Sequence, residues 1–218
     1  MKSIVLKAVF LAIAHVVVFH ALSFSQNLKP ATELQKSEII KKMQSAALST
    51  NSMECKFVQS KTLSVLAETV TSEGKMYFKK ENKLRWQYEK PYSYIYILSE
   101  GKVYIKSEGN TSTFDTNSNK MFKEISEIMI GGVRGNLLLN NKKFSAQYFM
   151  GADKAVIKLT PTGAELKNMI SSINLTVSTS DWLVKSIEMV EKGGDITLIT
   201  FTEKNVNKSI ADTLFRLN

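Results

Sequence analysis

The chain has 218 residues, and its 29 Lys and Arg side chains against 20 Asp and Glu side chains give a formal net charge of +9 at pH 7. Its single cysteine, Cys55, excludes an intrachain disulfide and any Cys-x-x-Cys metal or redox site. The two histidines, His15 and His20, lie in a leader that we expect to be removed, which leaves no imidazole for nucleophilic, acid–base or metal chemistry. We therefore expect neither an enzyme nor a bound cofactor or metal.

The N-terminal residues 1–25 have the pattern of a secretory signal peptide. Two lysines precede an apolar run over residues 9–19, and small residues stand at positions −3 and −1 of a cut before Gln26. As a membrane anchor this run is too short to cross the ~30 Å hydrocarbon core of a bilayer. We expect residues 26–218 to form one exported domain.

The excess positive charge is spread along the chain as single lysines between apolar segments. A nucleic-acid-binding protein usually concentrates its charge in a patch with stacking aromatic side chains. The densest places here are only the pairs Lys41-Lys42, Lys79-Lys80 and Lys142-Lys143. We expect a solvated surface and no nucleic-acid partner.

The first expected element after the leader is an amphipathic helix. Thr32 and Gln35 have the spacing of a capping box, which satisfies free backbone N–H groups at a helix start. The run of small polar residues at 49–52 marks the expected end of this helix. Its apolar residues recur with a period near 3.6, at Leu34, Ile39, Ile40, Met43, Ala46 and Ala47.

From residue 53 the apolar period changes to two, which is typical of strands with one buried face. A Ser/Thr-rich stretch separates the first alternating segment from the second. Further strands, joined by short turns, are expected over residues 92–98, 102–106 and 111–115. The alternating positions of the first three strands are Met53, Cys55 and Phe57, then Gly74, Met76 and Phe78, then Leu84, Trp86 and Tyr88.

The alternation stops near residue 117, where a second amphipathic helix is expected. Its apolar face would carry Met121, Phe122, Ile125, Ile128 and Met129, and Gly131-Gly132 would end it. Strands then resume over residues 144–150, 155–159, 170–178, 183–191 and 197–203. The expected fold is mainly β, with a single curved antiparallel sheet and two helices.

The apolar face of such a sheet must be covered. In one interpretation the sheet curls and fills itself with its own side chains, as a small barrel does. In the other, the sheet forms a cup, the second helix is its lid, and a cavity lies between them. The methionines of that helix suit a surface that accepts varied apolar shapes, although they are also common in ordinary cores. Both interpretations stay open at this level.

Several motifs, in order, resemble those of the periplasmic lipoprotein carrier family, LolA. The first are Phe57-Val58-Gln59 and the strand Gly74-Lys75-Met76-Tyr77-Phe78-Lys79. The others are Leu84-Arg85-Trp86 followed by Pro91, Ser99-Glu100-Gly101-Lys102, Leu159-Thr160-Pro161 and the closing segment Ala211-Asp212-Thr213-Leu214-Phe215.

The resemblance implies a half-open barrel of about ten or eleven strands with a helical lid. It also implies a monomer in the periplasm that takes acylated lipoproteins from an inner-membrane ATP-driven release complex to an outer-membrane acceptor. The inward strand residues would line an acyl-chain cavity, and residues 121–129 would form the lid. The predicted lining is Met53, Cys55, Phe57, Met76, Phe78, Leu84 and Trp86.

One position departs from the family pattern. The known carriers have an arginine that holds the lid where this chain has Lys80, a single mobile donor in place of a planar fork. We predict Lys80 as a rim contact to the lid, with a solvated lysine as the alternative.

Three other functions remain as alternatives. A carrier or sensor of another lipid, such as a phospholipid or glycolipid, would use the same fold. An envelope hydrolase would need a nucleophile and a base, which the missing histidines disfavour. A structural β-sandwich module would have a filled core and take up no lipid.

Overall fold

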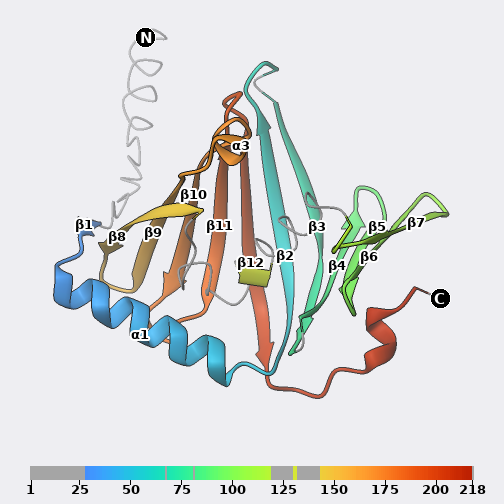
Figure 1. Cartoon of the computed structure of the whole chain (residues 1–218), viewed down its shortest axis with the longest axis horizontal. Coiled ribbons are helices and arrows are strands. Elements are labelled where there is room, and N and C mark those ends of the chain that lie inside the picture. The colour runs from blue at the N-terminus through green and yellow to red at the C-terminus, as the bar shows by residue number, and fades with distance from the viewer. Residues whose placement is uncertain (1–27, 67, 81, 119–129, 132–142, 218) are drawn as a thin grey trace, which may run out of the picture.

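The computed structural model describes residues 28–66, 68–80, 82–118, 130–131 and 143–217. Twelve strands form one antiparallel sheet (Figure 1). The strands are β1 (Lys29–Pro30), β2 (Ser52–Leu63), β3 (Glu68–Lys79), β4 (Lys83–Lys90), β5 (Tyr94–Ser99), β6 (Lys102–Ser107), β7 (Asn110–Asp115), β8 (Phe144–Met150), β9 (Lys154–Pro161), β10 (Ile170–Ser178), β11 (Val184–Glu191) and β12 (Ile196–Val206). The helices are α1 (Glu33–Ser49), the short α3 (Ala164–Lys167) and the 3-10 turn η1 (Asp212–Phe215).

The strand order is β1-β8-β9-β10-β11-β12-β2-β3-β4-β5-β6-β7. Over the described residues the end strands β1 and β7 do not pair with each other, so the sheet is open. The expected fold class, a curved antiparallel sheet shaped as a half-open barrel, is confirmed. All eleven strands expected from the alternation are present, and the additional one is the two-residue β1, which pairs with β8.

Helix α1 forms where the capping pattern predicts it. The Thr32 hydroxyl accepts a hydrogen bond from the Gln35 backbone N–H at 3.3 Å, and the Gln35 side chain accepts one from the Thr32 N–H at 3.0 Å. The side chains of Ile39, Met43 and Ala47 are buried, and Figure 1 shows the helix lying across one end of the strands.

The prediction that Leu34 belongs to the buried helix face is wrong, because 82% of this residue is exposed. At 100° per residue, the five positions from Leu34 to Ile39 rotate the side chain about 140° away from the buried stripe.

The Ser/Thr-rich stretch that we expected between two strands is itself strand. β2 and β3 pair without interruption from Ser52 with Lys79 to Leu63 with Glu68. The distal part of this hairpin is mostly exposed or half-buried on both faces, so it lacks the apolar alternation that marks a strand in sequence. At its tip the Ser64 hydroxyl donates to the Gly193 carbonyl oxygen at 3.0 Å, which ties the hairpin to the turn between β11 and β12.

The two faces of the sheet have different covers. We call the face against which α1 packs the inner face, and the opposite one the outer face. On the outer face the C-terminal segment packs Ile210 and Phe215 against Ile97 of β5. The Asp212 carboxylate accepts hydrogen bonds from Lys79 and Lys83 at 3.0 and 3.1 Å, and these contacts fasten the segment to the sheet.

Candidate functional site: the inner face of the sheet

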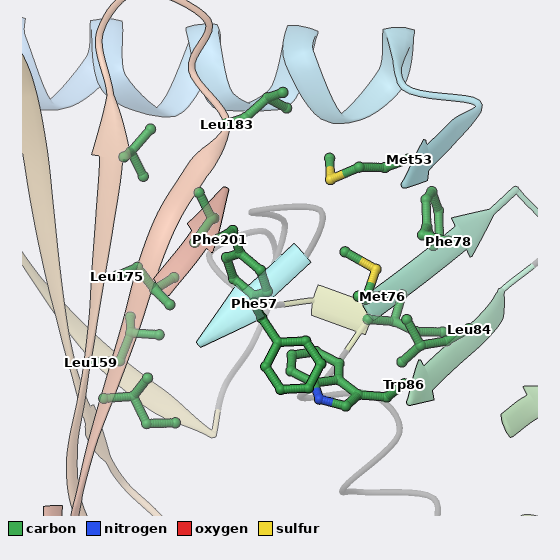
Figure 2. Close-up of a cluster of buried hydrophobic side chains, with 14 of the residues drawn as sticks. Met53, Phe57, Met76, Phe78, Leu84, Trp86, Leu159, Leu175, Leu183 and Phe201 are labelled. Carbon is green, nitrogen blue, oxygen red and sulfur yellow. The ribbon is translucent and has the colours of Figure 1, made fainter. Parts of the chain in front are cut away.

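All seven residues predicted to line a cavity lie on the inner face, and the strand register brings them together. In an antiparallel pair, directly opposed residues share a face. Met53 is opposite Phe78, Cys55 is opposite Met76, and Phe57 is opposite Gly74. Across the next pair, Met76 is opposite Trp86 and Phe78 is opposite Leu84. Each of the seven is at most 4% exposed, and all belong to one continuous apolar cluster (Figure 2).

Aromatic rings occupy the middle of this cluster. The ring centroids of Phe57 and Trp86 are 4.9 Å apart, and those of Phe57 and Tyr88 are 5.1 Å apart in an edge-on arrangement. Phe201 of β12 meets the Trp86 indole edge-on at 5.8 Å. Such tilted and edge-on pairs are the favoured geometries of aromatic side chains.

Gly74 makes the position of the Phe57 ring possible. A Cβ atom at Gly74 would lie 2.7 Å from Phe57 Cζ and would also meet the Gln87 carbonyl oxygen. The register shifts here, with Glu73 opposite Lys90 and Gly74 opposite Tyr88, so β4 carries an extra residue. A glycine in a strand often marks such a bulge or a close approach, and both are present at Gly74.

The inner face extends well beyond the three strands from which we predicted the lining. The same cluster continues through β5 and β6, through β9, β10 and β12, and onto α1. The strand positions have the same alternation as the predicted ones, and the positions on α1 have the helical period of 3.6, so the two patterns were sufficient to find them. The main additions are Ile39, Met43, Tyr96, Leu98, Val103, Ile157, Leu159, Ile173, Leu175, Val177 and Phe201.

Few polar groups enter this cluster from the described residues. The Tyr88 hydroxyl donates a 2.8 Å hydrogen bond to Gln59 Oε1, and burial raises the pKa of Tyr88 to about 12. Burial likewise raises the pKa of the Cys55 thiol to about 12, against a smaller opposing effect of Lys204. The thiol is therefore protonated and unreactive at neutral pH, as expected of a buried structural cysteine.

The predicted lid, Met121, Phe122, Ile125, Ile128 and Met129, lies outside the described residues. The position directly after it, Ile130, is helical, 8% exposed and part of the inner-face cluster. The chain therefore passes against the inner face at the end of the predicted lid.

Lys80 lies at the end of α1. Its ammonium group donates a 3.1 Å hydrogen bond to the Leu48 carbonyl oxygen, and its backbone N–H donates to the Asn51 carbonyl oxygen at 2.7 Å. A cation there interacts favourably with the free carbonyl groups at the helix C-terminus. The contact between Lys80 and the lid stays a prediction.

The outer face carries a separate groove of about 380 Å³ over β8 to β12. Apolar side chains such as Val156 and Leu198 line it together with Lys158 and Glu188. Asn174, also in its lining, donates a 2.7 Å hydrogen bond to Glu188. This groove shares no residue with the inner-face cluster.

A metal site and a membrane-spanning helix are both absent from the part of the chain that the structure describes. Within it, no three His, Cys, Asp or Glu side chains gather closely enough to hold a metal ion. Its helices are also too short or too polar to cross a membrane.

Comparison with solved structures finds folds of similar extent at very low identity. An uncharacterised conserved protein of Thermus thermophilus has a TM-score of 0.49 at 12% identity, covering 84% of this chain and 94% of its own. Lipoprotein LppX of Mycobacterium tuberculosis has 0.48 at 10%, covering 83% and 99%. A LolA-superfamily protein of Nitrosomonas europaea has 0.46 at 10%, covering 83% and 97%.

No curated protein sequence matches this chain. A family model does match it, the one described as outer membrane lipoprotein carrier protein LolA, over residues 48–218. This match begins at the end of α1 and includes every inner-face strand, as well as the outer-face C-terminal segment. The chain therefore belongs to the LolA family.

Proposed function

We propose that this protein carries acylated lipoproteins by holding their acyl chains against the inner face of its sheet. The observation that supports this proposal is the size and continuity of the inner-face cluster, which runs across the strands from β8 to β6 and onto α1. The description of the family as lipoprotein carriers supports the same function. We therefore propose a binding protein and no enzymatic activity.

The free energy of burying a chain explains why a carrier is needed. Each buried methylene contributes about 0.8 kcal/mol, so a chain of about sixteen carbons contributes on the order of 12 kcal/mol. Lost freedom of the ligand and ordering of side chains reduce the net affinity below that limit. Since spontaneous exit from a membrane would be slow, loading requires an energised donor. We propose an inner-membrane ATP-driven release complex as the donor and an outer-membrane acceptor as the destination.

The inner-face side chains are buried against one another and against their cover. Phe57, Phe78 and Leu84 are each at most 1% exposed. We propose that this is a closed state in which the protein's own side chains fill the site. In the loaded state, the predicted lid would open and acyl chains would replace these side chains in the site. The burial of Ile130 in the cluster supports a lid at this face.

The proposed compartment is the periplasm. The signal-peptide pattern of residues 1–25 supports export, and removal of that segment would leave residues 26–218 as the working carrier. A monomer is sufficient for this function, since all inner-face strands belong to one chain.

Photo-crosslinking tests where acyl chains bind. A diacylated lipopeptide with a diazirine in one chain is bound, irradiated and mapped by peptide mass spectrometry. We expect adducts on the half-buried inner-face side chains, such as Tyr94, Ile105 and Phe114. Adducts confined to the outer groove around Val156 and Leu198 would overturn the proposal.

The principal alternative is a carrier or sensor of another lipid. Inner-face side chains recognise hydrocarbon and do not distinguish one headgroup from another. Competition between the lipopeptide and phospholipids of equal chain length separates the two functions. A carrier of lipoproteins retains the lipopeptide, whereas a phospholipid or glycolipid carrier releases it.

A further inference from the structure

One polar atom in the inner-face cluster has no partner among the described residues. The Nε1 atom of the Trp86 indole is fully buried and makes no hydrogen bond there. The residue as a whole is only 4% exposed, so water does not reach the nitrogen freely. Indole N–H is a donor only, and a buried donor usually has an acceptor. An apolar side chain of similar size would avoid this unfavourable burial.

The neighbouring hydroxyl does not fill this role. Tyr88 is two residues along β4 on the same face, and a polar interaction with the indole lowers the Tyr88 pKa, against the larger effect of burial. The indole nitrogen nevertheless has no acceptor within hydrogen-bond distance and angle, and the Tyr88 hydroxyl donates its own proton to Gln59 Oε1 at 2.8 Å. The Phe57 and Phe201 rings that pack against the indole offer no oxygen acceptor (Figure 2).

The location of this donor points to its ligand. Trp86 lies in the middle of the inner face, opposite Met76 on one side and Tyr96 on the other. A ligand that reaches the indole must therefore enter apolar surroundings, and it must offer an acceptor at one point. An acyl chain that ends in an ester or amide has this composition, because its hydrocarbon is apolar and its carbonyl oxygen is an acceptor.

We infer that the Trp86 indole N–H donates a hydrogen bond to the ester or amide carbonyl at the head of a bound acyl chain. This inference rests on the proposed function and adds a polar recognition point and a direction to it. The carbonyl end of the chain lies at Trp86, and the hydrocarbon extends from there along the inner face. The site thereby distinguishes acyl chains from alkyl chains of the same length.

The test uses two soluble ligands that differ in one group. 1-Myristoyl-lysophosphatidylcholine carries an ester, and its 1-O-tetradecyl analogue carries an ether in the same place. Both are titrated as monomers by calorimetry. We expect the wild-type protein to bind the ester about two- to tenfold more tightly, which is the usual contribution of one hydrogen bond. Trp86→Phe keeps an aromatic ring but removes the donor, and it should bring the ratio of ester to ether affinity close to one.

Trp182→Phe serves as the matched control, because it removes the other tryptophan and should keep the preference for the ester. If wild-type protein binds ester and ether equally, or if Trp86→Phe keeps the preference, the inference is wrong while the proposed function stands. If neither ligand binds, the proposed function fails, and the inference fails with it.

A second measurement on wild-type protein keeps the inference testable if Trp86→Phe does not fold. Nuclear magnetic resonance of ¹⁵N-tryptophan-labelled protein resolves the two indole protons, and Trp182→Phe assigns them. Hydrogen bonding moves an indole proton to lower field. We expect the Trp86 proton to move in this direction with the ester ligand and not with the ether. Equal shifts with both ligands would overturn the assignment of the donor.

Discussion

Replacing Gly74 with alanine tests the packing that positions the Phe57 ring. The new Cβ would lie 2.7 and 2.8 Å from two atoms of the Phe57 ring, about 1 Å closer than an ordinary contact, and it would also meet the Gln87 carbonyl oxygen. The ring can rotate only by disturbing Trp86 and Tyr88, whose centroids lie 4.9 and 5.1 Å away. Overpacking of a core usually costs 1–3 kcal/mol, and contact with backbone puts this case at about 3 kcal/mol.

The assay is thermal unfolding followed by tryptophan fluorescence. For a domain of this size, about 3 kcal/mol lowers the Tm by roughly 6–12 °C. Gly193→Ala is the matched control, because nothing lies within 4 Å of its added Cβ. Phe57→Leu in the Gly74→Ala background should recover part of the loss, since it relieves the ring contact but not the backbone contact. A Tm for Gly74→Ala within the error of the Gly193→Ala value would refute this account of the inner face.

Three further predictions concern the thiol, the lid and the C-terminal segment. The Cys55 thiol, with a pKa raised to about 12 by burial, should resist a charged disulfide reagent at pH 8 and react on unfolding; rapid reaction of the folded protein would contradict its burial. Ile125→Glu on the predicted apolar lid face should abolish retention of a lipopeptide in a spin-column assay, whereas Ser126→Glu on the predicted polar face should not. If both variants retain the lipopeptide, the predicted lid has no role in binding. Hydrogen bonds from Lys79 and Lys83 lower the pKa of Asp212, so the stabilisation they supply is fully present above the unfolded-state pKa and is lost as the pH falls through the lower folded-state pKa. The protection of residues 210–217 against hydrogen exchange, relative to the intrinsic rate at each pH, should therefore fall in acid as this carboxylate is protonated in wild-type protein. It should already be lower at pH 7 in Asp212→Asn, and equal protection in both proteins at pH 7 would contradict the role of the carboxylate.

Alternation of apolar residues was sufficient to predict the sheet and its inner face. Met53, Cys55 and Phe57 share a face because successive side chains of a strand point to opposite sides, and this rule depends on no tertiary contact. The register that joins them to Met76 and Trp86 follows from the same rule, since a slip by one residue would expose the whole set.

Elements without apolar alternation were missed, or their predicted length was too short. The distal part of the β2–β3 hairpin has polar residues on both faces. It is stabilised by hydrogen bonds between the two strands and by contacts such as the hydrogen bond from Ser64 to the Gly193 carbonyl oxygen. Strand β1 has two residues, too few for a period. Leu34 was misplaced because one apolar residue in the first helical turn fits a loose pattern without lying on the buried stripe.

The contacts of long polar side chains could not be predicted from spacing. Parity places Lys80 on the inner side of its hairpin end, but its flexible side chain reaches the Leu48 carbonyl oxygen at the end of α1. Likewise, no local pattern joins Asp212 to Lys79 and Lys83, which are about 130 residues away in the chain. The unpaired Trp86 nitrogen is a similar case, because hydrogen-bond satisfaction depends on the assembled cluster.

Burial of the inner face has a consequence for uptake. A cluster whose members are nearly all inaccessible cannot accept a chain unless some part of its cover moves. The described cover includes α1, whose buried side chains pack on the inner face and whose last turn accepts a hydrogen bond from Lys80. We propose that the predicted lid is the part of the cover that moves.

Native mass spectrometry of the mature protein, purified from its own cell envelope without detergent, tests the central claim most directly. We predict one acylated protein or lipopeptide bound per chain, released together with its acyl chains when the protein is denatured. Protein that is empty, and that also takes up no acylated lipopeptide offered to it, would contradict the claim and favour a sheet whose core is simply filled.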